Sequence, residues 1–225
     1  MERKAISPLH FISNDDAPLS HSEQVLLACK GGVRWIQVRM KKGDDAQIEQ
    51  EALDCLHICL QHHAVCIIND RVELAARIAA HGVHLGKEDI SPRQARKLLG
   101  NHAIIGGTAN TLHDIRQLVQ KGVDYIGLGP YRFTATKQLL APLLGQDGYI
   151  TIFNNIRQSN MQGKEYPPII AIGGICLKDV KPLMETGIHG IAVSSAIADS
   201  GDIPMATSAF VKAVKQIKTA NTTAQ

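Results

Sequence analysis

The sequence predicts an α/β fold, a single-domain (β/α)8 TIM barrel, and three observations lead to that prediction. The chain has 225 residues, and a closed barrel of this kind takes about 200 to 250 residues as one domain. Short apolar runs alternate with amphipathic helical patterns along nearly the whole chain, which is typical of a parallel sheet covered by helices. The third observation is a glycine, followed by a β-branched residue, that recurs where a helical pattern gives way to an apolar run.

These glycine junctions predict turns from helix to strand. Glycine accepts the left-handed conformation that ends many helices, and Val or Ile then favours an extended strand. The four junctions are Gly31-Gly32-Val33, Gly82-Val83, Gly122-Val123 and Gly187-Ile188.

The strands are predicted from short apolar runs, and the helices from apolar residues at helical spacing between those runs. The predicted strands are Leu9–Ser13, Trp35–Met40, Val65–Asn69, Gly82–Leu85, Ala103–Gly106, Tyr125–Gly129, Ile169–Ile172 and Gly190–Ser194. The predicted helices are Ser22–Lys30, Asp45–His62, Val72–Ala80, Pro92–Leu99, Leu112–Lys121, Tyr149–Gln158, Lys178–Thr186 and Pro204–Lys218. The fourth helix has the clearest start, a serine cap followed by proline at the first helical position.

The same pattern sets the domain organisation. Eight strand–helix units in this length average about 28 residues each, which suits one barrel over residues 1–218. Residues 219–225 are small and polar, and we expect a disordered tail there. A doubly wound open sheet is the alternative, but no GxGxxG motif follows the first strand.

Composition excludes several function classes. The net charge is +3, from 24 basic and 21 acidic residues, and aromatic residues make up only 4% of the chain. A nucleic-acid-binding surface is therefore not expected, because it needs clustered basic residues and stacking aromatics. No run of about 18 apolar residues predicts a membrane span, and no signal peptide is recognisable. The five cysteines lack a CxxC pair, which favours a reducing compartment and predicts a cytoplasmic protein.

Polar residues and paired glycines follow nearly every predicted strand. In a barrel the carboxyl ends of the strands meet at one mouth, where the active site forms. The residues concerned are Gln37–Lys41, Asn69–Arg71, Gly86–Asp89, Gly106–Thr108, Gly129–Pro130 with Thr134–Lys137, Gly173–Gly174 and Ser194–Ser195. This convergence is the main functional signal of the sequence.

The mouth divides by its chemistry into three expected subsites. Gly173–Gly174 and Ser194–Ser195 follow the last two strands, where barrels often bind phosphate through backbone N–H groups, unless they are only turn glycines and a small-residue helix start. Asp70 and Asp89 suit Mg²⁺, which takes one or two carboxylates plus phosphate oxygens. Each aspartate could instead cap a helix or turn. Arg39, Lys41 and Lys137 would hold a diphosphate.

A fourth group of residues has a simpler explanation. Cys55, Cys59, His62 and His63 lie at helical spacing, which could indicate a metal site. Apolar residues surround them along the predicted helix, and buried free cysteine commonly behaves as a small hydrophobic residue. We therefore expect core packing there.

Eight short motifs in order resemble the thiamine-phosphate synthase family. Each motif alone is weak, but together they span the chain from about Leu9 to Val214. They are Gln37–Lys41, Asn69–Arg71, Gly82–Gly86, Asp89, Gly127–Pro130, Thr134–Lys137, Ala171–Ile175 and Ser194–Ile197.

The resemblance implies a barrel that joins 4-amino-5-hydroxymethyl-2-methylpyrimidine diphosphate to hydroxyethylthiazole phosphate, giving thiamine phosphate and diphosphate. It implies that the pyrimidine diphosphate is bound by Gln37, Val38, Arg39, Met40, Lys41, Asn69, Thr108 and Lys137. It also implies that Asp70 and Asp89 hold Mg²⁺. The thiazole phosphate would be bound by Thr134, Ala135, Thr136, Gly174, Ser194 and Ser195.

The chain departs from the family pattern at four positions. Thr108 replaces the usual serine after the fifth strand, and Asn110 replaces a histidine two residues later. Met40 stands where Glu usually precedes the lysine, and Lys87 stands where Gln is common. These changes bear on substrate fit more than on the reaction class.

The expected mechanism is a dissociative displacement in which Mg²⁺, Arg39, Lys41 and Lys137 stabilise the departing diphosphate. The thiazole nitrogen then attacks the pyrimidine methylene carbon, positioned by its phosphate anchor. One alternative is the family's thiazole tautomerase branch, which needs a positioned base, and another is a non-catalytic barrel that binds phosphorylated ligands. The sequence leaves open the oligomeric state, a homo-oligomer included, and whether the thiazole substrate is carboxylated.

Overall fold

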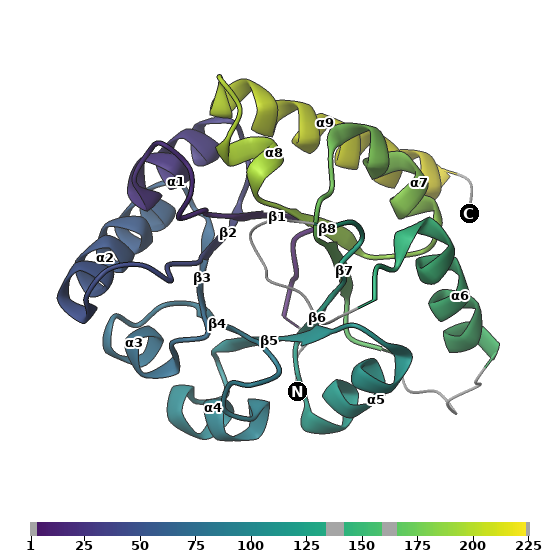
Figure 1. The fold of residues 1–225 in the computed structure, drawn as a ribbon, viewed down its shortest axis with the longest axis horizontal. Helices are drawn as coiled ribbons and strands as arrows, with labels where there is room; N and C mark the ends of the chain where they lie inside the picture. The colour runs from purple at the N-terminus through teal and green to yellow at the C-terminus, as the bar shows by residue number, and fades with distance from the viewer. Residues whose placement is uncertain (1–3, 134–141, 159–165, 224–225) are drawn as a thin grey trace.

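The computed structural model describes residues 4–133, 142–158 and 166–223, and within them eight parallel strands close into a barrel (Figure 1). The strands are β1 Leu9–Ile12, β2 Trp35–Val38, β3 Val65–Asn69, β4 Gly82–Leu85, β5 Ile104–Ala109, β6 Tyr125–Leu128, β7 Ile169–Ile172 and β8 Gly190–Val193. Each strand pairs with the next, and β8 pairs with β1 to close the ring. The predicted fold class is confirmed.

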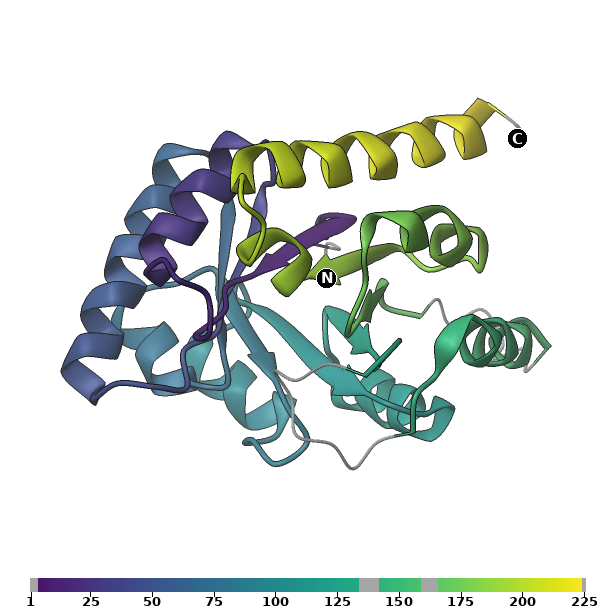
Figure 2. The same ribbon diagram turned by 45° about the horizontal axis from the view of Figure 1, so that its top comes forward.

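Helices surround the barrel and form its outer layer. They are α1 His21–Lys30, α2 Asp45–Gln61, α3 Val72–Arg77, α4 Pro92–Leu99, α5 Leu112–Lys121, α6 Gly145–Gln158, α7 Val180–Glu185 with the 3-10 turn η1 Leu177–Asp179 before it, α8 Ser195–Ala198 and α9 Ile203–Thr223. Figure 2 shows the long α9 running across the outside of the barrel beside α1 and α7. No helix among the described residues is long and apolar enough to cross a membrane.

Alternation along each strand separates two hydrophobic layers. Side chains that point inward fill the barrel, and this set includes Ile12, Trp35, Ile67, Ile104, Tyr125, Ile170 and Ala192. Their neighbours along the strands point outward and pack under the helices, as Ile36 and Val38 do on β2. Because successive side chains of a strand face opposite sides, the residue type at each strand end decides whether its side chain reaches the mouth.

Tyr125 fills the barrel interior because Gly106 leaves room for it. A Cβ atom at position 106 would lie 2.2 Å from the Tyr125 ring, and the register places these two residues side by side on β5 and β6. The ring also packs edge-on against His10 and Trp35. A single aromatic cluster therefore occupies the interior below the mouth.

The glycine junctions are helix-to-strand turns as predicted, but the reason differs at the second one. Gly32, Gly122 and Gly187 have φ values of 100°, 75° and 99°, the conformation that glycine favours. Gly82 instead lies inside β4, where a Cβ atom would sit 1.9 Å from the carbonyl oxygen of Ile104. The left-handed residue after α3 is Ala79, with φ 54°. Close strand packing explains Gly82.

The predicted elements are confirmed, with changes at their ends. The seventh helix is split into η1 and α7, and α8 is an additional short helix directly after β8. The last helix continues to Thr223, so the expected disordered tail is wrong for residues 219–223, and residues 224–225 lie outside the described range. No glycine or proline follows Lys218 to end the helix there.

Candidate active site at the mouth of the barrel

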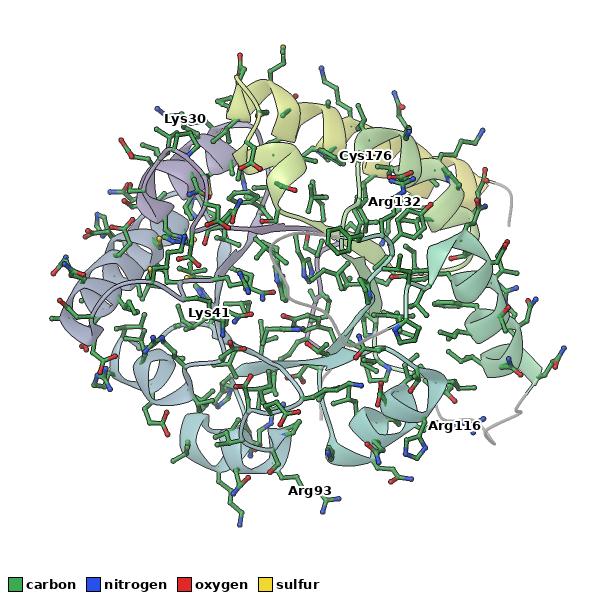
Figure 3. All side chains as sticks on the ribbon, viewed as in Figure 1. Lys30, Lys41, Arg93, Arg116, Arg132 and Cys176 are labelled. Carbon is green, nitrogen blue, oxygen red and sulfur yellow. The ribbon has the colours of Figure 1, made fainter. Side chains whose placement is uncertain are left out.

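The polar residues predicted after the strands lie together at the carboxyl end of the barrel, as far as the structure describes them. Thr134, Ala135, Thr136 and Lys137 lie outside the described residues. Figure 3 shows Lys41 inside the ring of helices, whereas Lys30, Arg93 and Arg116 lie on its outer rim. The described part of the mouth therefore contains residues of all three predicted subsites, but it lacks Lys137.

Gln37 and Asn69 form an amide pair on neighbouring strands. The side chain of Gln37, at the end of β2, donates from Nε2 to Oδ1 of Asn69 at the end of β3, over 2.7 Å. Gln37 is almost completely buried. Fixing one amide against another leaves each side chain with a defined set of free donors and acceptors, which suits recognition of a nitrogen heterocycle.

Val38 and Met40 do not contribute side chains to this mouth. Both are buried in the outer hydrophobic layer under the helices, because alternation along β2 turns them away from Gln37. Only their backbone atoms can contact a ligand at the mouth. The period of two along the strand is a sequence signal that would have separated them from Gln37.

A network from the loop after β1 fixes the backbone of the segment that carries Arg39 and Lys41. The backbone N–H of Arg39 donates to Oγ of Ser13 over 3.0 Å, and that of Lys41 donates to the Asp15 carboxylate over 3.1 Å. His21 on α1 joins the two acceptors, with Nδ1 2.7 Å from the Ser13 hydroxyl and Nε2 3.2 Å from Asp15. The sequence analysis missed these three residues, because their partners are distant in the chain.

Asp70, Asp89 and Lys41 form a compact charged cluster. The Lys41 ammonium group contacts the Asp70 carboxylate, and Asp89 accepts the backbone N–H of Gly86 over 2.6 Å. Burial opposes ionisation of Asp70, but hydrogen bonds with Asp89 and Lys41 lower its pKa. Burial and the neighbouring Asp70 raise the pKa of Asp89. Each of these adjacent carboxyl groups affects the ionisation of the other, and a cation bound between them would offset their negative charge.

The sequence analysis left open whether Asp70 and Asp89 cap helices or turns, and the structure shows what each side chain contacts. Arg71 is the N-cap residue of α3 and makes no side-chain cap bond, so Asp70 does not cap that helix. Ser91 caps α4 with its own side chain, while Asp89 closes the short turn back to Gly86. Asp70 also has a positive φ of 65°, an uncommon conformation for a non-glycine residue that is frequent at functional sites.

The donor set of this cluster fits a magnesium ion better than a structural metal. Within the described residues, no group of three or more His, Cys, Asp or Glu side chains could hold a metal ion. Two carboxylates are enough for Mg²⁺, which takes its remaining ligands from phosphate and water. The Cys55 and Cys59 side chains are fully buried in the hydrophobic core, as the sequence analysis expected.

Thr108 connects the mouth to the aromatic interior. Its Oγ1 lies 3.0 Å from Nε2 of His84, and Nδ1 of the same ring lies 3.0 Å from the Tyr125 hydroxyl. The imidazole of His84 is buried, so these two contacts satisfy both ring nitrogens. The sequence analysis treated His84 only as part of a strand motif and did not assign it a place in the site.

Two of the departures from the family pattern meet at one carboxylate. Asp114, in the first turn of α5, accepts the backbone N–H of Asn110 and the ammonium group of Lys87, each over 2.8 Å. The Asn110 side chain donates to the carbonyl of Gly129 over 2.5 Å. Asn110 and Lys87 therefore join the loops after β4, β5 and β6, and Asn110 has no role as a proton acceptor there.

The predicted phosphate subsite lies between the loops after β7 and β8. Register pairs Ile172 with Ala192 at the ends of these strands, which brings the two loops side by side. Gly173 and Gly174 have φ values of 100° and 63°, a turn that residues with a side chain rarely adopt. Ser194 precedes α8 and makes no side-chain cap bond, so the first N–H groups of that helix have no cap acceptor.

Comparison with known proteins identifies the family of this chain. A sequence model of the family described as thiamine monophosphate synthase matches residues 9–197. The thiamine-phosphate synthase of Bacteroides thetaiotaomicron is 41% identical over 209 residues, which is 93% of this chain and 98% of the relative. That of Phocaeicola vulgatus is 44% identical over 202 residues, covering 90% of this chain and 95% of the relative.

A solved structure shows the same architecture. The thiamine phosphate pyrophosphorylase of Pyrococcus furiosus superposes with a TM-score of 0.81 at 27% identity, covering 93% of this chain and 96% of the other. From its sequence and its closed barrel, this chain belongs to the thiamine monophosphate synthase family.

Proposed function

We propose that this chain is a Mg²⁺-dependent transferase that joins 4-amino-5-hydroxymethyl-2-methylpyrimidine diphosphate to 4-methyl-5-(2-hydroxyethyl)thiazole phosphate or its carboxylated form. Formation of thiamine phosphate is the reaction of the family to which the chain belongs. The observation that carries the proposal is the amide pair Gln37–Asn69 directly beside the Lys41–Asp70–Asp89 cluster. The amide pair suits the heterocycle of the substrate, and the charged cluster beside it suits the diphosphate and its metal ion.

The chain's own residues orient the pyrimidine substrate and stabilise its leaving group. The fixed amides of Gln37 and Asn69 hydrogen-bond the aminopyrimidine ring, and Thr108 adds a hydroxyl on the neighbouring wall. Arg39 and Lys41 hold the diphosphate and stabilise the negative charge that develops as it departs. Lys137, outside the described residues, is proposed from the sequence to share this role.

Asp70 and Asp89 would hold Mg²⁺ in this proposal. When bound, the ion supplies positive charge that neutralises the diphosphate. The contact between Lys41 and Asp70 supports the assignment, because a cationic group already lies against this carboxylate.

Gly173–Gly174 and Ser194–Ser195 anchor the phosphate of the thiazole substrate, with Thr134–Thr136 proposed from the sequence. Anchoring that phosphate holds the ring nitrogen toward the pyrimidine methylene carbon, which makes the attack effectively intramolecular. No protein nucleophile is required. Two further predictions are untested: a cytoplasmic location, which fits the five unpaired cysteines, and a homo-oligomeric state.

The tautomerase alternative receives no support from the geometry near β5. Asn110 is tied to Gly129 and does not act as a proton acceptor there, and Thr108 is engaged with His84. A proton-transfer reaction on a thiazole carboxylate needs a positioned base, and neither side chain supplies one.

Diphosphate release is the experiment that tests the proposal. The purified chain is incubated with both substrates and Mg²⁺, then with each substrate omitted, and then with a chelator in place of the metal. We expect release only when both substrates and Mg²⁺ are present, with thiamine phosphate formed in equal amount. Release that does not depend on the thiazole, or full release in the chelator, would contradict the proposal.

A further inference from the structure

A two-point ion pair joins the loop after β6 to the loop after β7. Both terminal nitrogens of Arg132 contact the Asp179 carboxylate, one on each oxygen. Arg132 belongs to the loop after β6, and Asp179 lies in η1 after β7. Figure 3 places Arg132 and Cys176 beside each other near α7, and Arg132 and Asp179 are 47 residues apart in the sequence. It therefore links two loops that both border the mouth.

The carboxylate of Asp179 is held in its charged form. It is 3% exposed and also accepts the backbone N–H and the thiol of Cys176, each over 2.9 Å. Burial opposes ionisation, but hydrogen bonds from Arg132 and Cys176 lower the pKa of Asp179 to about 2. The hydrogen bonds to Asp179 in turn raise the pKa of Arg132. The pair is ionised throughout the physiological pH range.

Arg132 also holds the carbonyl oxygens of the glycine pair. Its backbone N–H donates to the carbonyl of Gly173 over 3.0 Å, and its guanidinium donates to the carbonyl of Gly174 over 3.4 Å. In a planar trans peptide the N–H group points opposite to the carbonyl. Holding both carbonyls toward Arg132 therefore turns the N–H groups of Gly174 and Ile175 away from it, toward the other side of the turn.

The residues around this contact leave little room for another arrangement. A Cβ atom at Gly174 would lie 3.0 Å from the Cβ of Arg132, and one at Gly173 would lie 2.8 Å from the Cβ of Pro130. The Arg132 guanidinium stacks over the Tyr131 ring at 4.8 Å, and the backbone N–H of Tyr131 donates to Ile172 over 2.9 Å. The glycine turn is thus held from one side by consecutive residues of the loop after β6.

We infer that Arg132 and Asp179 are positioning residues that hold the Gly173–Gly174 turn in the shape that binds the phosphate of the thiazole substrate. This inference rests on the proposed function and assigns roles to two residues that the motifs at the strand ends did not indicate. Arg132 acts through the turn and not on the phosphate, because its guanidinium faces the Asp179 carboxylate and the carbonyl of Gly174. A phosphate beside the guanidinium would also face the negative charge of that carboxylate.

The kinetics of three variants test this role. Arg132→Gln and Asp179→Asn remove the ion pair, whereas Arg132→Lys keeps the charge but loses the two-point contact. The KM for each substrate and kcat are measured with saturating Mg²⁺. We expect the KM for the thiazole phosphate to rise about tenfold in the first two variants. The KM for the pyrimidine diphosphate and kcat at saturation should stay within about twofold, and Arg132→Lys should lie between wild type and Arg132→Gln.

Arg96→Gln is the matched control. Arg96 on α4 bonds Asp124 over 2.7 Å, and Asp124 also accepts a backbone N–H, that of Ile105, over 2.7 Å. This pair lies just before β6, at the end of the barrel opposite the mouth. Its loss should lower the melting temperature without changing either KM. An equal change in both KM values for Arg132→Gln, or a selective change in Arg96→Gln, would overturn the inference.

The same experiment separates failure of the inference from failure of the proposed function. If the wild-type chain does not turn over, the proposed function is wrong, and no variant is then needed to show it. If the wild type turns over normally and Arg132→Gln keeps its KM for the thiazole phosphate, only the inference is wrong. Circular dichroism confirms that each variant is folded, and Arg132→Lys, the mildest change, keeps the test valid if Arg132→Gln fails to fold.

Discussion

The ring of His84 bridges the aromatic interior and the mouth, with Nε2 3.0 Å from Oγ1 of Thr108. Its other nitrogen is engaged by the Tyr125 hydroxyl over 3.0 Å. Thr108 therefore has two tasks: it satisfies a buried ring nitrogen and presents its hydroxyl at the mouth. A buried polar group that loses its partner is costly, which makes the threonine hydroxyl important for stability and for binding.

Thr108→Val should test the role of the hydroxyl group, because valine has nearly the same shape as threonine. Valine keeps the branched shape but removes the hydroxyl, so the hydrogen bond between Thr108 and Nε2 of the buried His84 ring is lost. We expect a loss of about 1 to 3 kcal/mol in the free energy of unfolding and a fall in kcat/KM of about tenfold or more. Urea unfolding and steady-state kinetics measure the two effects. Thr108→Ser, which keeps the hydroxyl, should retain most of the free energy of unfolding and most of kcat/KM. A valine variant with wild-type stability would contradict this account.

Asp89→Asn should weaken metal binding without weakening the metal-free protein. Asparagine keeps an oxygen acceptor for the Gly86 N–H group, and it removes one of two adjacent carboxyl groups that repel each other when both are ionised. We expect metal-free Asp89→Asn to melt at or above the wild-type temperature. The Mg²⁺ concentration for half-maximal rate should rise about tenfold or more. Melting below wild type in a chelator would show that Asp89 is mainly structural.

Acid should destabilise the barrel, beginning with His10. This ring is buried and stacks on Trp35 at 4.5 Å between ring centroids. Burial lowers the pKa of His10 well below its usual value of 6.5. Below about pH 6.5, His10 binds a proton in the unfolded chain but stays neutral in the folded chain. The contribution of His10 to stability is therefore full above this pH and falls as the pH decreases.

His10→Phe should flatten this dependence. Phenylalanine keeps the stacking on Trp35 but cannot titrate. We expect the urea midpoint of the variant to fall less between pH 7 and pH 5 than that of the wild type. Some dependence should remain, because burial also lowers the pKa of His81 and His189. If the urea midpoint of the variant fell as much between pH 7 and pH 5 as that of the wild type, His10 would not dominate the acid sensitivity.

The sequence could predict the barrel because each element carries its own local signal. Ser91–Pro92 marks the start of α4, and Gly122 marks the end of α5. Strand direction then places Gln37, Asn69 and Asp70 at one mouth without any knowledge of long-range contacts. The site could be located to this extent because all parallel strands of a barrel end on the same side.

Other parts of the site depend on contacts that local patterns cannot encode. The contact of Ser13 with His21 and Arg39, and that of Arg132 with Asp179, join loops whose approach is set by the closed barrel. Nothing in the sequence around Asp179 distinguishes it from an ordinary first-turn aspartate. The outward direction of Val38 and Met40 was predictable from the period of two, whereas these long-range pairs were not.

Cys176 should be the one thiol that reacts readily in the folded protein. The other four cysteines are buried, and Cys176 alone is partly exposed. Burial raises the pKa of Cys55, and a hydrogen bond with Cys59 together with burial raises that of Cys29, so these thiols are also poor nucleophiles. We expect Ellman's reagent to titrate about one thiol per chain rapidly and the others only on unfolding. Cys176→Ser should abolish the rapid phase while keeping a hydroxyl donor for Asp179. More than one rapid thiol in the wild type would show that the layer between α1, α2 and β3 opens in solution, because Cys29, Cys59 and Cys66 lie there.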